Sequence, residues 1–372
     1  MSKTILITGG AGFIGSHLAD ELLRHGYRVK ALDCLIPQVH GNGQQRPDYL
    51  DPEVELLRGD VRNPQAVKEA LKGTDAVFHF AARVGVGQSM YEIREYTDVN
   101  NTGTAVLMEA LSQNPVERLV TASSMSIYGE GTCRSPDGRQ HQQVLRTAAQ
   151  LKKGQWEPRA KNGDVLQPVP TSEQKTPALA SVYALSKYDQ ERMTLVCGQA
   201  YQVPVTALRF FNVYGTRQAL SNPYTGVLAI FASRYLNGKS PLVFEDGRQR
   251  RDFVHVRDVV RACRLALETP EAAGEVFNIG SGKDYTIAQL AREMGQVMGR
   301  GDITPEITGK YRVGDIRHCF ADMGKAAQVL NFTPQVPFGE GMAELAGWVD
   351  RQIATDHVDQ ATRELSNRGL TV

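Results

Sequence analysis

Short apolar runs alternate with amphipathic stretches throughout the first half of the chain. The run Lys3–Thr8 ends at a glycine loop, and Gly12–His25 then has apolar residues at helical spacing until Gly26 stops it. Further strands are predicted at Tyr27–Leu32, Val54–Leu57, Ala76–Phe80 and Leu119–Ala122, with helices at about 64–71 and 93–112. Such alternation is typical of parallel strands joined by right-handed crossovers.

The second half keeps helical periodicity but loses the regular alternation. A helix is predicted from Tyr183 to about Tyr201, and Val205–Phe211 resembles another buried strand. Further helices are predicted near 223–237, 256–268, 286–298, 323–330 and 338–353. The predicted fold class is therefore α/β, with a Rossmann-type doubly wound parallel sheet and a smaller mixed α/β lobe.

Composition narrows the possible function classes. With 372 residues, of which 41% are hydrophobic, the chain can bury a large core and build about two domains. Its 42 lysine and arginine residues nearly balance its 41 aspartate and glutamate residues, so we expect neither nucleic acid nor a membrane surface as a partner. No apolar run reaches the ~20 residues that span a bilayer, and no basic region precedes the first strand, which predicts a soluble cytoplasmic protein.

The cysteines give no sign of a disulfide framework or a metal site. They are scattered, odd in number and without a C-x-x-C pair. Cys133 and His141 lack further ligands nearby in the sequence. We expect reduced thiols and no metal.

The glycine loop predicts a dinucleotide site. Gly9, Gly12 and Gly15 follow a strand and open a helix, so the backbone amides at the helix start can approach a pyrophosphate. Asp33 closes the second predicted strand, where a carboxylate accepts hydrogen bonds from ribose hydroxyls and repels a 2′-phosphate, which favours NAD over NADP. Asp60 ends the next strand and is predicted either to meet the adenine or to cap the helix near Pro64.

Tyr183 and Lys187 supply candidate hydride-transfer chemistry. Their i,i+4 spacing places both side chains on one face of a helix, so the ammonium can lie near the phenol and lower its pKa. A tyrosine with a lowered pKa can act as a base near neutral pH. His79 and His255 lie in apolar runs and are predicted to be structural.

Together, several motifs resemble the extended short-chain dehydrogenases/reductases that act on nucleotide sugars. They are the glycine loop, Gly59-Asp-Val61, His79-Phe-Ala-Ala82, Ser124-Met-Ser-Ile-Tyr-Gly129, Tyr183-x-x-x-Lys187, Arg209-Phe-Phe-Asn-Val-Tyr-Gly215, Arg251-Asp-Phe-Val-His-Val256 and Arg312-Val-Gly-Asp315. They occur in the family's order and cover roughly residues 3–350. The resemblance implies an enzyme that uses NAD, with a nucleotide-diphosphate sugar as its partner and a homodimeric assembly built through the helices near 93–112 and 180–200.

The same resemblance implies roles for individual residues. Ser124, Tyr183 and Lys187 would form the catalytic set. The cofactor contacts would be Gly9, Gly12, Phe13, Ile14, Gly15, Asp33, Asp60, Val61, Phe80, Ala81, Ala82, Asn100, Tyr183, Lys187 and Phe211. The substrate contacts would be Ser124, Ser126, Asn212, Arg251, Arg312 and Asp315. The arginines suit this role chemically, because a diphosphate is best bound by fork-shaped cations.

The residues after Ser124 favour 4-epimerisation. Relatives that dehydrate a sugar resemble one another in having an Asp-Glu pair there, whereas this chain has Met125 and Ser126. Segments 32–41 and 82–90 and a long insertion resemble bacterial dTDP-L-rhamnose 4-epimerases, which form dTDP-6-deoxy-L-talose. The alternatives are a UDP-hexose, UDP-N-acetylhexosamine or UDP-glucuronate 4-epimerase, a nucleotide-sugar dehydratase or reductase, and an NAD-sensing binding module.

The predicted organisation has three parts. Residues 1–205 would form the NAD-binding domain, residues 206–355 mainly a substrate-binding lobe interleaved with it, and residues 356–372 a terminal helix or tail. Residues 131–177 are rich in Gly, Pro, Gln and Lys and are predicted to be an insertion. The insertion would be either a tolerated surface loop or a lid or subunit contact over the sugar.

Overall fold

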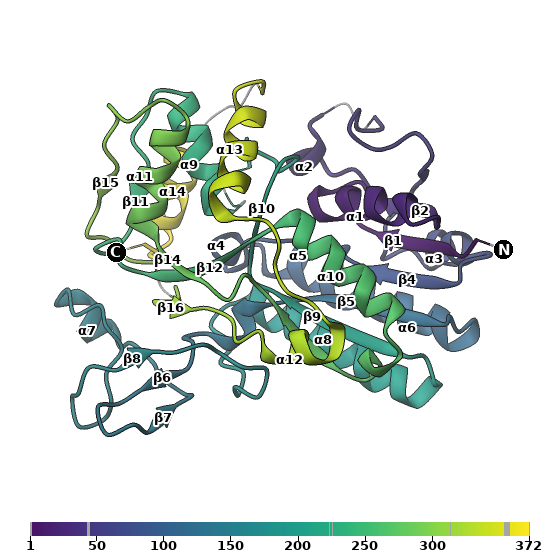
Figure 1. Cartoon of the computed structure of the whole chain (residues 1–372), viewed down its shortest axis with the longest axis horizontal. Helices are drawn as coiled ribbons and strands as arrows, with labels where there is room; N and C mark the ends of the chain where they lie inside the picture. The colour runs from purple at the N-terminus through teal and green to yellow at the C-terminus, as the bar shows by residue number, and fades with distance from the viewer. Residues whose placement is uncertain are drawn as a thin grey trace.

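A seven-stranded parallel sheet forms the centre of the chain (Figure 1). The computed structural model describes residues 2–42, 45–222, 224, 226–312, 314–352 and 358–371. The strands are β1 (Thr4–Thr8), β2 (Arg28–Asp33), β3 (Glu55–Arg58), β4 (Ala76–His79), β5 (Arg118–Ser124), β9 (Val205–Phe210) and β13 (Val276–Ile279). Their order is β13-β9-β5-β4-β1-β2-β3, which confirms the predicted doubly wound α/β fold.

Side chains of the sheet are buried on both faces, which explains why its strands read as continuous apolar runs. In β1, Ile5 and Ile7 belong to one buried cluster, whereas Leu6 belongs to another. Helices α1 (Phe13–Arg24), α10 (Val256–Glu268) and α12 (Gly324–Leu330) cover the first face. Helices α3 (Pro64–Leu71), α6 (Gly103–Gln113) and α8 (Val182–Tyr201) cover the second.

The predicted helix over 93–112 is interrupted by a wider turn. It consists of α5 (Ile93–Thr97), a π-helical turn (Asp98–Thr102) and α6. The turn brings Asn100 into the interior, where it is fully buried. Such π-helical turns occur frequently at functional sites.

A smaller lobe packs against the carboxyl edge of the sheet. Its strands are β10 (Asn212–Tyr214), β12 (Arg250–His255), β14 (Asp284–Thr286) and β16 (His318–Cys319), and its helices are α9 (Val227–Leu236), α11 (Ile287–Val297) and α13 (Phe338–Val349). A short pair, β11 (Leu242–Val243) with β15 (Glu306–Ile307), and α14 (Val358–Asn367) complete it. Since β9, α10, β13 and α12 belong to the central sheet layers, the chain passes between the two parts more than once.

The insertion is a folded unit with a small core of its own. Strands β6 (Cys133–Arg134), β7 (Gln140–His141) and β8 (Gln167–Pro168) form an antiparallel sheet, and α7 (Ala148–Lys152) lies beside it, at the lower left of Figure 1. Cys133, Val144 and Leu166 are buried together.

The remaining short helices are α2 (Pro37–His40), α4 (Val86–Ser89) and the 3₁₀ turns Met125–Tyr128 and Pro270–Ala272. Within the described part of the chain, every helix is too short or too polar to cross a bilayer.

Candidate active site

A cavity of about 610 Å³ opens at the carboxyl edge of the sheet. The strand order reverses between β1 and β4, and ligands of doubly wound sheets bind at such a switch point. Most of the residues predicted to bind ligands line this cavity. They are Gly9, Gly12, Phe13, Ile14, Gly15, Asp33, Asp60, Val61, Phe80, Ala81, Ala82, Ser124, Ser126, Tyr183, Lys187, Phe211 and Asn212.

The glycine loop leaves room for a ligand at the start of α1. Gly12 is the N-cap and has no side-chain cap, so backbone amides of the first helical turn stay available. A Cβ at Gly12 would contact only the Gly9 carbonyl oxygen, at 3.4 Å, so the protein itself does not need a glycine there. Gly9 differs, because it has φ +72° and a Cβ would lie 2.9 Å from the Ala81 amide nitrogen. The open space before the helix fits a dinucleotide pyrophosphate.

Asp33 is fixed at the end of β2 by the backbone around it. Its Oδ2 accepts a hydrogen bond from the Ala11 amide at 3.0 Å, and its Oδ1 accepts one from the Leu35 amide at 2.9 Å. The His40 side chain is buried, with Nε2 3.8 Å from Asp33 Oδ1. The carboxylate therefore lies in the cavity wall, where a ribose would present its hydroxyls.

Asp60 does not cap α3. Asn63 is the N-cap and accepts hydrogen bonds from the Gln65 and Ala66 amides, so the capping alternative for Asp60 is wrong. Asp60 instead forms a two-pronged ion pair with Arg62, whose Nη2 lies 2.6 Å from Asp60 Oδ2. Hydrogen bonds from Arg62 lower the pKa of Asp60. Asp60 lines the cavity as a carboxylate, which leaves the adenine contact as a prediction.

Ser124 and Tyr183 meet at the carboxyl end of β5. Ser124 is the last residue of β5 and caps the 3₁₀ turn, since its Oγ accepts from the Ser126 amide at 3.1 Å. Tyr183 lies in the first turn of α8, which Ser181 caps by accepting from the Ala184 amide. The Tyr183 amide also donates to Ser89 Oγ at 3.0 Å.

The pKa of Tyr183 is raised, which contradicts the prediction of a lowered value. Burial raises the pKa of the phenol, while a hydrogen bond with Ser124 opposes that shift. The ammonium of Lys187 is engaged elsewhere, because Nζ donates to Gln190 Oε1 at 2.7 Å. The i,i+4 spacing placed both side chains on the cavity wall, but it did not show that the charged group reaches the phenol.

Lys187 belongs to a buried network that sequence reasoning missed. Gln190 Nε2 donates to Thr104 Oγ1 at 2.9 Å and lies 3.3 Å from His79 Nε2. Burial lowers the pKa of Lys187 to about 7 and that of His79 to about 3. His79 also lies 2.8 Å from Thr8 Oγ1, so its predicted structural role is confirmed. The i,i+3 spacing of Lys187 and Gln190 is the sequence signal for this network.

Carboxylates in the cavity wall lie far from Ser124 along the sheet. Among the described residues that line the cavity they are Asp33, Asp60 and Glu95. Asp33 and Asp60 follow β2 and β3, and Arg62 pairs with both Asp60 and Glu95. Strands β4 and β1 separate these positions from β5, which carries Ser124.

Four predicted site residues do not line the cavity. The Asn100 amide is occupied inside the protein, where Oδ1 accepts from the Arg83 amide at 2.7 Å and Nδ2 donates to Ser186 Oγ at 2.8 Å. Arg251, Arg312 and Asp315 lie together in a separate network, with Arg312 Nη2 3.0 Å and Arg251 Nη2 3.5 Å from Asp315. Their role as substrate contacts stays a prediction.

Four cavity residues carry buried polar atoms that have no partner in the described part of the chain. They are His40 Nδ1, Arg83 Nε, Asn212 Oδ1 and Gln218 Oε1. Unpaired buried polar atoms are costly, so this wall fits a ligand with hydrogen-bonding groups. Asn212 was a predicted substrate contact; His40 and Gln218 have no motif that marks them in the sequence.

The His255 ring is buried and caps α10, where its Nδ1 accepts from the Arg257 amide. Burial lowers its pKa to about 4, so the ring is neutral and structural, as predicted.

Comparison with known proteins gives a consistent picture. The sequence profile of the NAD dependent epimerase/dehydratase family matches residues 5–148 and 161–280, which leaves residues 149–160 of the insertion outside the match. The chain is 34% identical to a dTDP-L-rhamnose 4-epimerase of Burkholderia thailandensis over 94% of this chain and 96% of that protein.

Solved structures with the same architecture are also nucleotide-sugar epimerases. The UDP-glucose 4-epimerase of Thermotoga maritima, solved with UDP-glucose, is 30% identical with a TM-score of 0.76, covering 93% of this chain and 98% of that one. The UDP-glucuronic acid 4-epimerase of Bacillus cereus, in complex with UDP-glucuronic acid and NAD, is 27% identical with a TM-score of 0.77, covering 94% and 99%.

Proposed function

Because this chain belongs to the NAD-dependent epimerase/dehydratase family and so uses NAD, we propose that it is a nucleotide-sugar 4-epimerase that converts dTDP-L-rhamnose to dTDP-6-deoxy-L-talose. The alternative of an NAD-sensing binding module is set aside, since the named relatives are enzymes. The family includes several reactions, so the choice among them rests on the residues around Ser124.

The main observation in favour of 4-epimerisation is the identity of the two residues that follow Ser124, Met125 and Ser126. Met125 packs in a buried cluster with Tyr128 and Phe211, and Ser126 Oγ accepts a hydrogen bond from Ser124 Oγ at 3.1 Å. Neither side chain provides the acid and base that elimination of water from the sugar needs. Among the described carboxylates of the cavity wall, Asp33 and Asp60 follow β2 and β3, with β4 and β1 between them and Ser124. The third, Glu95, lies 3.6 Å from Arg62.

The proposed reaction uses the predicted catalytic set, Ser124, Tyr183 and Lys187, together with the cofactor. Tyr183 accepts the proton of the sugar O4 and returns it later, while Ser124 holds O4 and the phenol in line by hydrogen bonding. Bound along the glycine loop, NAD would supply reversible hydride transfer at C4, so that the hydride can return to either face of the sugar, and its oxidised form would add a positive charge that favours ionisation of a nearby phenol. Burial of Tyr183 keeps bulk water from exchanging that proton.

Support for the specific sugar comes from one relative and one residue. The Burkholderia relative is a dTDP-L-rhamnose 4-epimerase. Val84 lines the cavity, and an apolar residue there suits a 6-deoxy sugar. Cys319 has no part in this choice, because it is buried beside Thr171 and is not among the described residues of the cavity wall. UDP-hexose, UDP-N-acetylhexosamine and UDP-glucuronate remain the alternative substrates, and a dehydratase or reductase the alternative activity.

The test is to incubate the purified protein separately with dTDP-L-rhamnose, UDP-glucose, UDP-glucuronate and UDP-N-acetylglucosamine and to resolve the C4 epimers by NMR. We expect dTDP-6-deoxy-L-talose from the first, with no net change in NADH absorbance. Conversion of a UDP sugar alone would refute the rhamnose assignment. Loss of water or net oxidation of NADH would refute 4-epimerisation.

We also propose a homodimer built through α5, α6 and α8. The exposed apolar side chains Ile93, Leu185 and Val196 lie on these helices. Light scattering at the monomer mass would oppose the proposal. A cytoplasmic location stays a prediction, testable by fractionation of cells that express the protein.

A further inference from the structure

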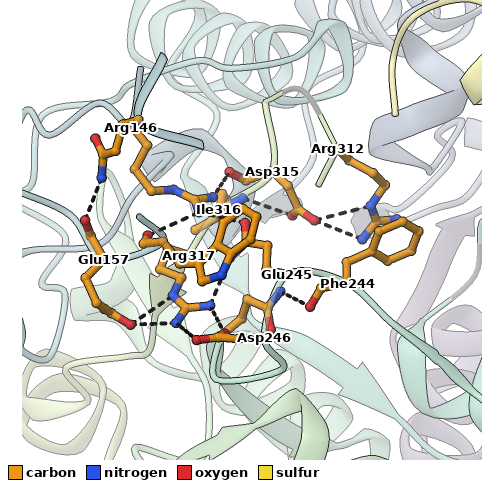
Figure 2. A network of polar contacts seen from close by, with 12 residues as sticks. Arg146, Glu157, Phe244, Glu245, Asp246, Arg312, Asp315, Ile316 and Arg317 are labelled. Atoms are coloured by element: carbon orange, nitrogen blue, oxygen red, sulfur yellow. Dashed lines mark hydrogen bonds and ion pairs between the residues drawn. The ribbon is translucent and has the colours of Figure 1, made fainter. Parts of the chain in front are cut away.

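Buried ion pairs join the insertion to residues 314–318, called here the 314–318 segment (Figure 2). This segment carries Asp315 and leads into β16. Asp315, Arg251 and Arg312 are predicted contacts to the sugar nucleotide, with the two arginines suited to its diphosphate. The contacts that hold the segment therefore bear on how the substrate binds.

Arg146 of the insertion lies at the centre of the network. Its side chain is only 3% exposed. Nε donates to Glu130 Oε1 at 2.8 Å, and Nη1 donates to Glu245 Oε1 at 2.6 Å. Its remaining nitrogen, Nη2, donates to the backbone carbonyl oxygen of Asp315 at 2.9 Å. One guanidinium thus joins the insertion, the loop after β11 and the 314–318 segment.

Arg317 and His318 of the same segment are held by Glu130 and by Glu157 of the insertion. Glu130 accepts hydrogen bonds from the Arg317 amide at 2.8 Å and the His318 amide at 3.1 Å. The fully buried Arg317 side chain donates from Nη2 to Glu157 Oε1 at 2.5 Å, and Glu157 Oε2 lies 2.7 Å from His318 Nε2. Trp156, next to Glu157, has its ring centroid 6.3 Å from that of Tyr311.

Arg251 of β12 also holds the segment. Its guanidinium donates to the carbonyl oxygens of Ile316 and, at 2.8 Å, Arg317. The carbonyls of Asp315, Ile316 and Arg317 are therefore all bound by arginine side chains from elsewhere in the chain. Since residues 314–317 form no helix or strand, these side chains determine their conformation.

The network also affects the charge of Asp315 and the backbone conformation of Glu245. Although burial opposes ionisation, Arg312, Arg251 and Arg146 together hold the pKa of the Asp315 carboxyl below its usual value. Glu245 has φ +52°, a conformation that favours glycine. A glutamate there is strained, and its buried pairs with Arg146 and Arg317 offset the strain.

We propose that Arg146 and Glu157 of the insertion are positioning residues that set the 314–318 segment, and through it Asp315 and Arg251, for the substrate's nucleoside diphosphate. The inference rests on the proposed function, because it takes the substrate to be a nucleotide sugar. In this proposal the insertion is neither a free surface loop nor a lid. It holds the 314–318 segment of its own subunit in place. Glu157 lies in the stretch that the family profile does not match, whereas Arg146 lies in the part that it matches.

The test compares Arg146→Gln and Arg146→Lys with the matched control Arg139→Gln. Arg139 lies in the same insertion and pairs with Asp137 at the surface, with 79% of its side chain exposed. For each full-length, NAD-loaded variant, calorimetry gives the Kd of dTDP and of UDP, and kinetics give KM and kcat for whichever sugar nucleotide is turned over.

We expect Arg146→Gln to raise the nucleoside-diphosphate Kd and the substrate KM roughly ten- to hundredfold, as expected for lost charge-assisted contacts. NAD content should stay unchanged, and kcat at saturation should stay within about threefold, as expected when substrate binding alone is weakened. Arg146→Lys keeps the positive charge but loses the forked guanidinium, so its Kd and KM should lie between those of the wild type and Arg146→Gln. Arg139→Gln should match the wild type.

Glu157→Gln is the second variant if Arg146→Gln does not fold, since Glu157 is 37% exposed and its loss disturbs less of the interior. It should raise the nucleoside-diphosphate Kd severalfold, with NAD content unchanged. Wild-type Kd values in the folded Arg146 and Glu157 variants would overturn the inference and leave the proposed function intact. A wild-type protein that binds neither dTDP nor UDP would overturn both.

Discussion

The glycine loop and the 314–318 segment are held in place by different kinds of contact. The glycine loop is fixed by backbone hydrogen bonds, such as Gly9 N to Leu32 O at 2.8 Å and Ser16 N to Gly12 O at 2.9 Å. The 314–318 segment is fixed by side chains, with Arg146 and Glu130 reaching it across 169 and 187 positions of sequence. A site held by backbone tolerates many side-chain changes, whereas one held by buried ion pairs fails when a single partner is lost.

Tyr183→Phe tests whether chemistry can be separated from the backbone-held cofactor site. Because only the phenol oxygen is removed, turnover should fall about 10²- to 10⁴-fold, the usual contribution of a general base. The amount of NAD that copurifies should not change, measured from the absorbance of the released cofactor. Retention of more than a tenth of wild-type turnover would exclude Tyr183 as the base.

Arg251→Ala and Arg312→Ala test the region around the 314–318 segment, which side chains hold in place. Loss of a charged diphosphate contact should raise KM about ten- to hundredfold, or about 1.5–3 kcal/mol. Arg251 should have the larger effect, because its side chain is 11% exposed while that of Arg312 is 43% exposed. Arg94→Ala, whose side chain is 92% exposed, is the control. An unchanged KM in both variants would mean that the diphosphate lies elsewhere.

The buried Lys187 predicts a pH-dependent stability of the cofactor-free chain. Burial lowers its pKa to about 7 from an ordinary value near 10.5, so the unfolded chain binds more protons between these values. The cost of the buried charge is complete below pH 7 and is relieved as the pH rises toward 10.5. Relative to Lys187→Met, the wild type should gain about 2.5 kcal/mol of unfolding free energy between pH 6 and pH 9.

Urea unfolding at the two pH values measures this difference. A constant gap between wild type and Lys187→Met would show that the amine keeps an ordinary pKa in the folded chain, as a well-solvated lysine does. Lys68→Met, which changes an exposed lysine of α3, is measured at the same two pH values as the control substitution.

Asp33→Asn is expected to have the smallest effect. The amide oxygen can still accept one of the two hydrogen bonds from the Ala11 and Leu35 amides, but the charge that repels a 2′-phosphate is lost. The ratio of NADP to NAD affinity should rise about tenfold, measured by fluorescence titration of the stripped protein. An unchanged ratio would assign cofactor selectivity to other residues, such as the neighbouring His40.

Much of the fold could be predicted because short-range patterns carry it. The predicted helix at 64–71 matches α3, and the predicted strands differ from the observed ones by one or a few residues at their ends, as with Phe80, which follows β4. The predicted helix over 93–112 contains a π-helical turn that periodicity alone does not indicate. Its extra residue per turn is stabilised by the burial of Asn100 against Arg83, a contact between separate segments.

The chemistry of Tyr183 could be predicted in part. Spacing placed Tyr183 and Lys187 on one face of α8, and both line the cavity. The direction of the phenol's pKa was wrong, since it depends on burial and on whether Lys187 turns toward Gln190. Both are decided by packing around the side chain and not by spacing along the helix.

The sequence by itself determined the doubly wound sheet, the glycine loop and the residues that end β2, β5 and β9 at one edge, because strand alternation and glycine spacing act over short distances along the chain. Only the tertiary structure decided what the insertion contacts. Its composition predicted a surface loop, or a lid or subunit contact, yet Arg146 and Arg317 are buried among Glu130, Glu157 and Glu245. The ion pairs Arg317–Glu245, Arg146–Glu245 and Arg317–Glu157 join residues 72, 99 and 160 positions apart. Such separations leave no periodic signal, so three-dimensional packing alone brings these charges together.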